Sequence, residues 1–209
     1  MEIKEKISRV ALKLFVERGF FEVSISDLRI EMSIDKGDFC NYFKSKEQLV
    51  NETIDRLWAP YFKSIINAAD ECGESSKKKL FNIFQKYSEV ESYLRDNFGV
   101  EKFDYRSIIC LMIEGIKIYE QIPNRIVDLN NKLLEKIECV IEDGKRLGEV
   151  ISTINSKSSA KQILSFLQSS VVLWGMNQNI DMKGLFKINF KHLWNRISVS
   201  KSNSKVIRN

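Results

Sequence analysis

Proline and glycine are scarce in this sequence of 209 residues, which contains two prolines and nine glycines. Because both residues interrupt helices, their scarcity beside 44% hydrophobic residues indicates long helices with short connections, an all-α fold. The sequence has no run of 18 apolar residues, the minimum for a membrane-spanning helix. Its start, MEIKEKISRV, lacks the hydrophobic segment of a signal peptide. We therefore expect a cytoplasmic protein with no membrane partner.

Motifs for catalysis and metal binding are also missing. The four cysteines (Cys40, Cys72, Cys110 and Cys139) are far apart and form no CxxC pair, which argues against a thiolate zinc site and fits a reducing compartment. The single histidine, His192, lies in a lysine-flanked amphipathic segment. There is no HExxH motif, no Ser/His/Asp order and no glycine-rich phosphate loop. We expect no enzyme activity, no metal and no cofactor.

The net charge of +5 comes from one end of the sequence. Residues 1–50 contain nine Lys/Arg and nine Asp/Glu, whereas residues 183–209 contain seven Lys/Arg and no acidic residue. The total charge is therefore no evidence that the first 50 residues bind nucleic acid; only the local placement of lysines bears on that question. The basic residues 200–209 are expected to form a disordered tail.

Three candidate helix starts follow one another between residues 24 and 47, in the stretch SISDLRIEMSIDKGDFCNYFKSKE. In each, a short side-chain oxygen can accept from first-turn amides, and an acidic or amide side chain follows three residues later. The pairs are Ser24 with Asp27, Asp35 with Asp38, and Ser45 with Gln48. Two short helices joined by a tight turn at residues 33–34 are predicted. This is a helix-turn-helix, whose second helix can enter the major groove of DNA.

The second short helix is expected to have two different faces. Phe39 and Phe43 are four residues apart and should point into the core. Lys36, Asn41 and Tyr42 would lie on the exposed side, where they suit phosphates and base edges. Three short helices of an ordinary helical domain with solvated lysines would leave the same pattern, so the residues alone keep that alternative open.

The first 50 residues resemble the DNA-binding domain of the tetracycline-repressor (TetR) family of transcriptional regulators. The matching positions are Ile7, Ala11, Leu14, Phe15, Gly19, Ser24, Asp27, Leu28, Ile34, Lys36, Gly37, Phe39, Tyr42, Phe43, Ser45, Lys46, Glu47 and Leu49. The resemblance implies a three-helix DNA-binding domain followed by a helical regulatory and dimerisation domain, about nine helices in all. It also implies a set of DNA-binding residues: Ser24, Asp35, Lys36, Gly37, Asp38, Cys40, Asn41, Tyr42 and Lys46.

Three positions depart from the family pattern and bear on which operator is bound. Arg29 replaces a small residue, Ser33 replaces the usual glycine of the turn, and Cys40 replaces a tyrosine that commonly contacts DNA.

We predict a DNA-binding domain at 1–47, a ligand-binding and dimerisation domain at 48–199, and the tail at 200–209. The first helix should end at Gly19. Pro60 predicts a kink near Ala59 in a helix that runs from Ser45 to about Cys72. Further helices are expected at about 76–98, 104–121, 123–148, 158–177 and 181–199. The helix at 104–121 is apolar on most sides, which predicts burial.

The regulatory domain should bind an effector with an apolar part. The candidate lining residues are large apolar groups and two polar ones: Trp58, Phe62, Phe84, Tyr87, Ile109, Met112, Glu114, Ile116, Tyr119, Phe166, Gln168 and Trp174. Aromatic side chains that simply fill the core would give the same pattern.

The last two helices carry wide apolar stripes. They can complete the core of one chain, whereas the family resemblance implies that they pair with a second copy. The predicted dimer residues are Ile163, Phe166, Leu167, Ser170, Trp174, Phe186, Phe190, Leu193, Trp194 and Ile197. Together these features predict a ligand-responsive homodimeric repressor that a small molecule releases from a palindromic double-stranded operator. An all-helical sensor or protein-interaction module without specific operator binding is the alternative.

Overall fold

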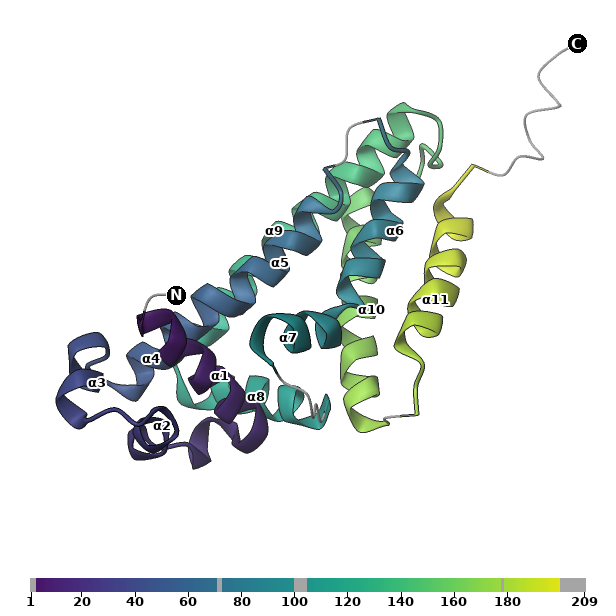
Figure 1. Cartoon of the computed structure of the whole chain (residues 1–209). Helices are drawn as coiled ribbons and strands as arrows, with labels where there is room; N and C mark the ends of the chain where they lie inside the picture. The colour runs from purple at the N-terminus through teal and green to yellow at the C-terminus, as the bar shows by residue number, and fades with distance from the viewer. Residues whose placement is uncertain (1–2, 71–72, 100–104, 178, 200–209) are drawn as a thin grey trace, which may run out of the picture. The chain divides into compact units, whose positions relative to one another are not determined.

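In the computed structural model, the described residues 3–70, 73–99, 105–177 and 179–199 are mainly helical, and none of them belongs to a β-strand (Figure 1). The predicted all-α class is confirmed. These residues form eleven α-helices and one π-helical turn, more than the nine or so expected, because two long predicted helices are interrupted. Within the same ranges, no helix combines the length and apolar character needed to cross a bilayer. The predicted tail, 200–209, lies outside the described residues.

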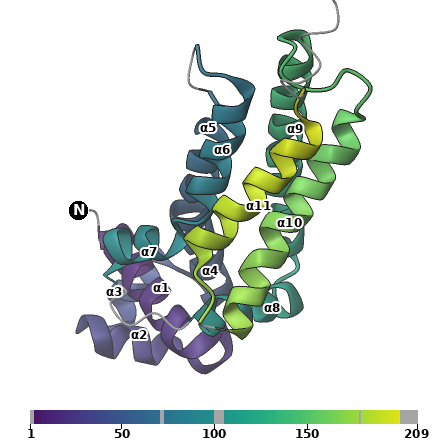
Figure 2. The same cartoon turned by 90° about the vertical axis from the view of Figure 1, so that its right-hand side faces the viewer.

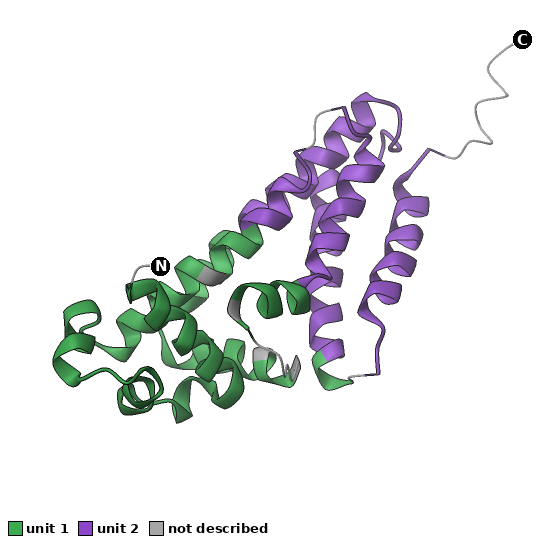
Figure 3. Cartoon of the chain, viewed as in Figure 1, with its two compact units in different colours: residues 1–62, 90–129, 175–178 green, residues 63–89, 130–174, 179–209 purple. Residues whose placement is uncertain are grey.

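The chain divides into two compact units, each assembled from segments that are separate in the sequence (Figure 3). Unit 1 comprises residues 1–62, 90–129 and 175–178, and unit 2 comprises residues 63–89, 130–174 and 179–209. These units are defined by packing. The functional boundary expected at residue 47 is a separate matter and stays a prediction.

Unit 1 begins with four helices, α1 (Ile3–Glu22), α2 (Ile25–Met32), α3 (Lys36–Tyr42) and α4 (Lys46–Thr53). Their shared core consists of fully buried apolar side chains: Ile7, Ala11, Phe15, Leu28, Phe39, Phe43 and Leu49. The helical backbone of α1 breaks at Gly19, with φ 86° and ψ 165°, where the sequence predicts its end, and a last turn follows to Glu22. α1 also packs against α8 (Tyr105–Ile118) in the same unit.

The helix that continues from α4 has a wider, π-helical turn just before Pro60. A π-helical turn, η1 (Ile54–Trp58), joins α4 to α5 (Ala59–Asn67), and the N–H of Ala59 donates to the carbonyl of Ile54. Pro60 is the second residue of α5, so the irregularity lies where a kink is predicted. Tyr61 is buried here against Tyr93 of α7 (Val90–Phe98), with the ring centroids 4.8 Å apart.

Unit 2 contains α6 (Ser76–Tyr87), α10 (Ser156–Met176), α11 (Met182–Ile197) and the larger part of α9 (Gln121–Arg146), seen from a second side in Figure 2. The single helix predicted at 76–98 is in fact two, because it stops at Tyr87 and resumes at Val90. An aromatic cluster joins α6, α10 and α11: the Phe84 ring lies 5.4 Å from Phe190, 6.0 Å from Phe186 and 6.1 Å from Phe166.

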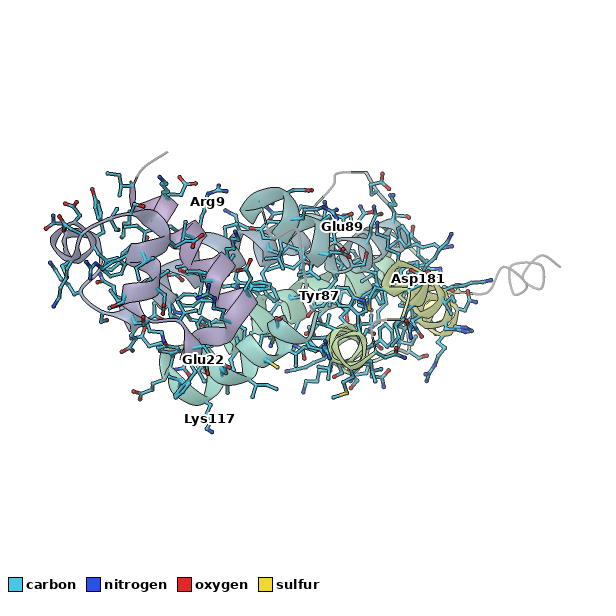
Figure 4. The ribbon with its side chains drawn as sticks, turned by 60° about the horizontal axis from the view of Figure 1, so that its bottom comes forward. Arg9, Glu22, Tyr87, Glu89, Lys117 and Asp181 are labelled. Atoms are coloured by element: carbon cyan, nitrogen blue, oxygen red, sulfur yellow. The ribbon has the colours of Figure 1, made fainter. Side chains whose placement is uncertain are left out.

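The prediction that the helix at 104–121 is buried is wrong for much of its surface. Four apolar side chains of α8 are 44% to 59% exposed: Met112, Ile113, Ile116 and Ile118. Lys117 on the same helix projects from the ribbon in Figure 4. The apolar content of this helix therefore exceeds what the single chain buries.

Candidate nucleic-acid interface

The first of the predicted helix starts forms a complete capping box. The Oγ of Ser24 accepts from the N–H of Asp27 at 3.1 Å, and Oδ2 of Asp27 accepts from the N–H of Ser24 at 2.7 Å. The hydrogen bonds from Ser24 lower the pKa of the Asp27 carboxyl because they stabilise its charged form. The cap thus fixes the start of α2, as its sequence predicts.

The turn between α2 and α3 is made by Ser33. Its backbone is left-handed, with φ 54° and ψ 42°, and it is the one residue other than glycine with positive φ in the described part of the chain. The N–H groups of Ser33 and Ile34 donate to the carbonyls of Ile30 and Arg29, both at 3.1 Å. These bonds close α2 before α3 begins.

α3 begins at a second cap, in which Oδ1 of Asp35 accepts from the N–H of Asp38 at 2.7 Å. Gly37 lies beside it, and a Cβ at Gly37 would lie a tight 3.2 Å from the same oxygen. The glycine therefore leaves room for the Asp35 cap at the start of α3.

The two faces of α3 are arranged as predicted. Phe39 and Phe43 are fully buried, with their rings 5.9 Å apart. Most of the predicted DNA-binding residues are exposed, namely Ser24, Asp35, Lys36, Gly37, Asp38 and Asn41, while Cys40, Tyr42 and Lys46 are half-buried. The polar side chains of α3 thus lie opposite its buried phenylalanines. The contact of each residue with DNA stays a prediction.

The two lysines around the start of α4 differ in their surroundings. The ammonium of Lys44 donates to the carbonyl of Cys40 at 2.8 Å, which satisfies a carbonyl at the end of α3. Lys46 is half-buried, and burial lowers its pKa, while the carboxylates of Glu114 and Asp27 act in the opposite direction. α4 is capped by Ser45, whose Oγ accepts from the N–H of Gln48 at 3.1 Å.

Glu114 was predicted to contact an effector, but its carboxylate is already bonded within the protein. Oε2 accepts from the N–H of Phe20 at 2.7 Å and from the N–H of Phe21 at 3.3 Å. These amides follow the break in α1 at Gly19. An acidic residue within an apolar segment was the available signal, but its partner, 94 residues earlier in the chain, is not readable from the sequence pattern.

The other candidate effector residues are divided between the units. In unit 1, Trp58, Phe62 and Ile109 are half-buried, Met112 and Ile116 are exposed, and Tyr119 is buried. In unit 2, Phe84, Tyr87 and Trp174 are buried, and Phe166 and Gln168 are half-buried. Burial raises the pKa of Tyr87. These residues stay candidates, and the buried ones also serve their own unit's core.

The predicted dimer residues largely fill the core of unit 2 in a single chain. Eight of the ten are buried, namely Ile163, Leu167, Ser170, Trp174, Phe186, Phe190, Trp194 and Ile197. The exposed large apolar side chains on the same two helices are different ones: Val172 at 42%, Leu173 at 53%, Met176 at 75% and Ile188 at 58% exposure. Two exposed serines, Ser165 and Ser169, lie on the Val172 face of α10.

A contact that the sequence did not suggest holds the π-helical turn. The guanidinium of Arg125, at the start of α9, donates to the carbonyl of Asn51 at 3.2 Å and pairs with the carboxylate of Asp55.

Among the described residues, no group of three or more His, Cys, Asp or Glu side chains is placed to hold a metal ion.

Comparison with known proteins identifies the N-terminal helices. Residues 7–53, which contain α2, α3, α4 and most of α1, match the model of the bacterial regulatory proteins of the tetR family. A curated relative, the HTH-type transcriptional repressor DhaR of Mycobacterium sp. (strain GP1), is 22% identical over 122 residues, 57% of this chain. That match spans 61% of the length of DhaR.

Solved structures extend the similarity to the remaining helices. A tetR-family transcriptional regulator from Cytophaga hutchinsonii has a TM-score of 0.74 at 16% identity, over 95% of this chain and 96% of the other. The regulator FadR from Bacillus subtilis, solved in complex with stearoyl-CoA, has a TM-score of 0.70 at 17% identity, over 90% of this chain and 96% of the other. At such identities the likeness establishes the fold alone.

Proposed function

We propose that this chain, whose residues 7–53 match the model of the tetR family of bacterial regulatory proteins, is a homodimeric repressor of that family in the cytoplasm. The dimer holds two copies of α3 about 34–36 Å apart, one turn of DNA, and so reads a palindromic operator. A small effector with an apolar part binds among the helices after residue 47 and favours a different arrangement, which lowers operator affinity.

The observation that carries this proposal is the construction of α3. Capping at Asp35 and the turn at Ser33 fix where the helix begins. Burial of Phe39 and Phe43 fixes its rotation, so that Lys36 and Asn41 face solvent together. A short helix held this firmly, with a polar outer face, suits insertion into the major groove.

The dimer surface is proposed on the outer faces of α10 and α11. Val172 and Leu173 on α10 and Ile188 on α11 leave apolar area in water in the single chain. Exposed Ser165 and Ser169 are small enough to let a second helix approach closely. This revised set replaces side chains that unit 2 already buries, and two-fold pairing would cover it.

The effector proposal rests on composition and on one relative. Large apolar side chains occur in both units, and FadR, of similar fold, was solved with stearoyl-CoA, a ligand with a long apolar part. For this chain we propose only the chemical class, a small molecule with a substantial apolar part.

Selection of duplexes from a random-sequence library by the purified full chain tests the central claim. We expect one enriched sequence with two inverted half-sites, whose affinity falls steeply with salt because phosphate contacts release counterions. Enrichment of no sequence would overturn the repressor proposal and favour the sensor module. Enrichment of a single unrepeated half-site would overturn the dimeric mode of binding alone.

A further inference from the structure

α1 and α8 contact each other where the carboxylate of Glu114 lies against Gly19, which has no side chain. Gly19 has φ 86°, and a Cβ placed on it would lie 2.8 Å and 2.9 Å from the two carboxylate oxygens of Glu114. No other residue type fits this space or this backbone without strain. The Glu114 carboxylate can therefore reach the main chain of α1 only because position 19 has no side chain.

The carboxylate is held there by main-chain donors. The N–H groups of Phe20 and Phe21 both donate to Oε2, at 2.7 Å and 3.3 Å. Bonds from amides to a charged acceptor are stronger than those to a neutral one and are steep in distance. A shift of α8 by about 1 Å would lengthen the shorter bond beyond the hydrogen-bonding range.

Apolar packing surrounds the same point. The Phe20 ring meets Tyr119, which follows α8, edge to face at 5.6 Å. Gly115, next to Glu114, also allows close approach, since a Cβ on it would lie 3.3 Å from Cε2 of Phe20 and 3.0 Å from Cδ1 of Ile122. This close fit makes the junction sensitive to small movements of α8.

The carboxylate of Glu114 also interacts electrostatically with Lys46, at the start of the helix that follows the helix-turn-helix. Burial lowers the pKa of the Lys46 ammonium, and the charge of Glu114 opposes this shift, so Glu114 favours the charged form of a residue in the first turn of α4. Glu114 thus bonds to the end of α1, just before α2, and interacts electrostatically with the start of α4, just after α3.

We propose that Glu114 is the positioning residue through which α8 and the helix-turn-helix control each other. When the carboxylate is bonded to the Phe20 and Phe21 amides, α2 and α3 are held in one position relative to α8; when α8 shifts, that position is released. This inference rests on the proposed function and assigns one contact to its regulation.

Reciprocity makes the claim testable without an effector. If α8 controls the helix-turn-helix, DNA bound by the helix-turn-helix must in turn alter α8. The probe is the duplex that the parent protein selects from a random library, and the readout is amide hydrogen exchange followed by mass spectrometry. In the parent, bound duplex should slow exchange severalfold in residues 105–118 as well as in residues 25–53. In Glu114→Ala, which leaves the Phe20 and Phe21 amides without this acceptor, the slowing should persist in 25–53 and disappear from 105–118.

Glu120→Ala is the matched control, because Glu120 is exposed just after α8; it should behave as the parent does. If circular dichroism shows that Glu114→Ala is unfolded, Glu114→Asp takes its place, since it keeps the charge but is too short to reach both amides. Equal slowing at 105–118 in parent and variant, or none in a parent that binds its duplex, would overturn this proposal and leave the proposed function standing. Selection of no duplex would overturn both.

Discussion

Ser33 shows how one backbone conformation sets the geometry of the helix-turn-helix. The left-handed region costs an L-residue roughly 1–2 kcal/mol, whereas glycine enters it freely. Glycine also increases the entropy of the unfolded chain, which offsets about 0.4–1 kcal/mol of the gain. Ser33→Gly should therefore stabilise the protein by about 0.5–1 kcal/mol, measured by urea unfolding.

The matched control is Ser26→Gly, which places glycine inside α2 and should lower stability because glycine is a poor helix former. Changes of the same sign in the two variants would contradict the assignment of a left-handed Ser33.

Asp27 provides a residue-scale prediction about pH. Its pKa is lowered below the ordinary 3.8 by hydrogen bonds from Ser24, so the charged carboxylate favours the folded state. Its contribution is present above pH 3.8 and is lost as pH falls through the lowered pKa. Asp27→Asn should thus lower the melting temperature at neutral pH, and the difference from the parent should shrink in strong acid. A difference that stays constant with pH would argue against the charged cap.

At the scale of the element, we expect different residues of α3 to serve stability and DNA recognition. Phe43 is fully buried, so Phe43→Ala should cost about 3–5 kcal/mol in unfolding free energy. Asn41 is exposed, so Asn41→Ala should change stability by less than about 0.5 kcal/mol. If Asn41 reads a base, the same change should reduce preference for the selected duplex over random DNA by about 1–3 kcal/mol per half-site. Loss of affinity for both duplexes alike would instead indicate a backbone contact.

Lys46 should behave in the opposite manner. Lys46→Ala is expected to weaken binding to all duplexes equally and to reduce the salt slope by about one unit, because a phosphate contact has no sequence information. Affinities at two salt concentrations measure this, with Lys132→Ala on α9 as the control. A change in sequence preference would show that Lys46 acts on bases or on the placement of α3.

Local features of these elements were predictable from the sequence, whereas long-range partners were not. The caps at Ser24, Asp35 and Ser45 and the inner faces of α2 and α3 depend on residues within four positions of each other. The position of the Glu114 carboxylate depends on Gly19, 95 positions earlier in the chain. Likewise, the wide stripe of α11 could not reveal which of its apolar side chains unit 2 covers.

For the whole molecule, the decisive quantity is the mass in solution. We expect sedimentation equilibrium at micromolar concentration to give twice the mass of the chain. Leu173→Glu and Ile188→Glu should shift this equilibrium toward the monomer, because each places a charge in the proposed apolar interface. Lys161→Glu, also exposed on α10, is the control for a change of charge alone. A monomeric parent would remove the basis for a palindromic operator.

The π-helical turn at Ile54–Trp58 has a consequence for how this chain can tolerate the loss of a residue. A π-turn accommodates one residue more than the α-helical turn it replaces, so loss of a single residue here would restore a regular α-helix. Because the wide turn and the α-turn that would replace it each complete about one revolution, the side chains that follow would keep nearly the same faces relative to α4. Tyr61 would therefore stay on the side of Tyr93. In this stretch the π-turn lets the chain carry one extra residue without changing which side chains face the core.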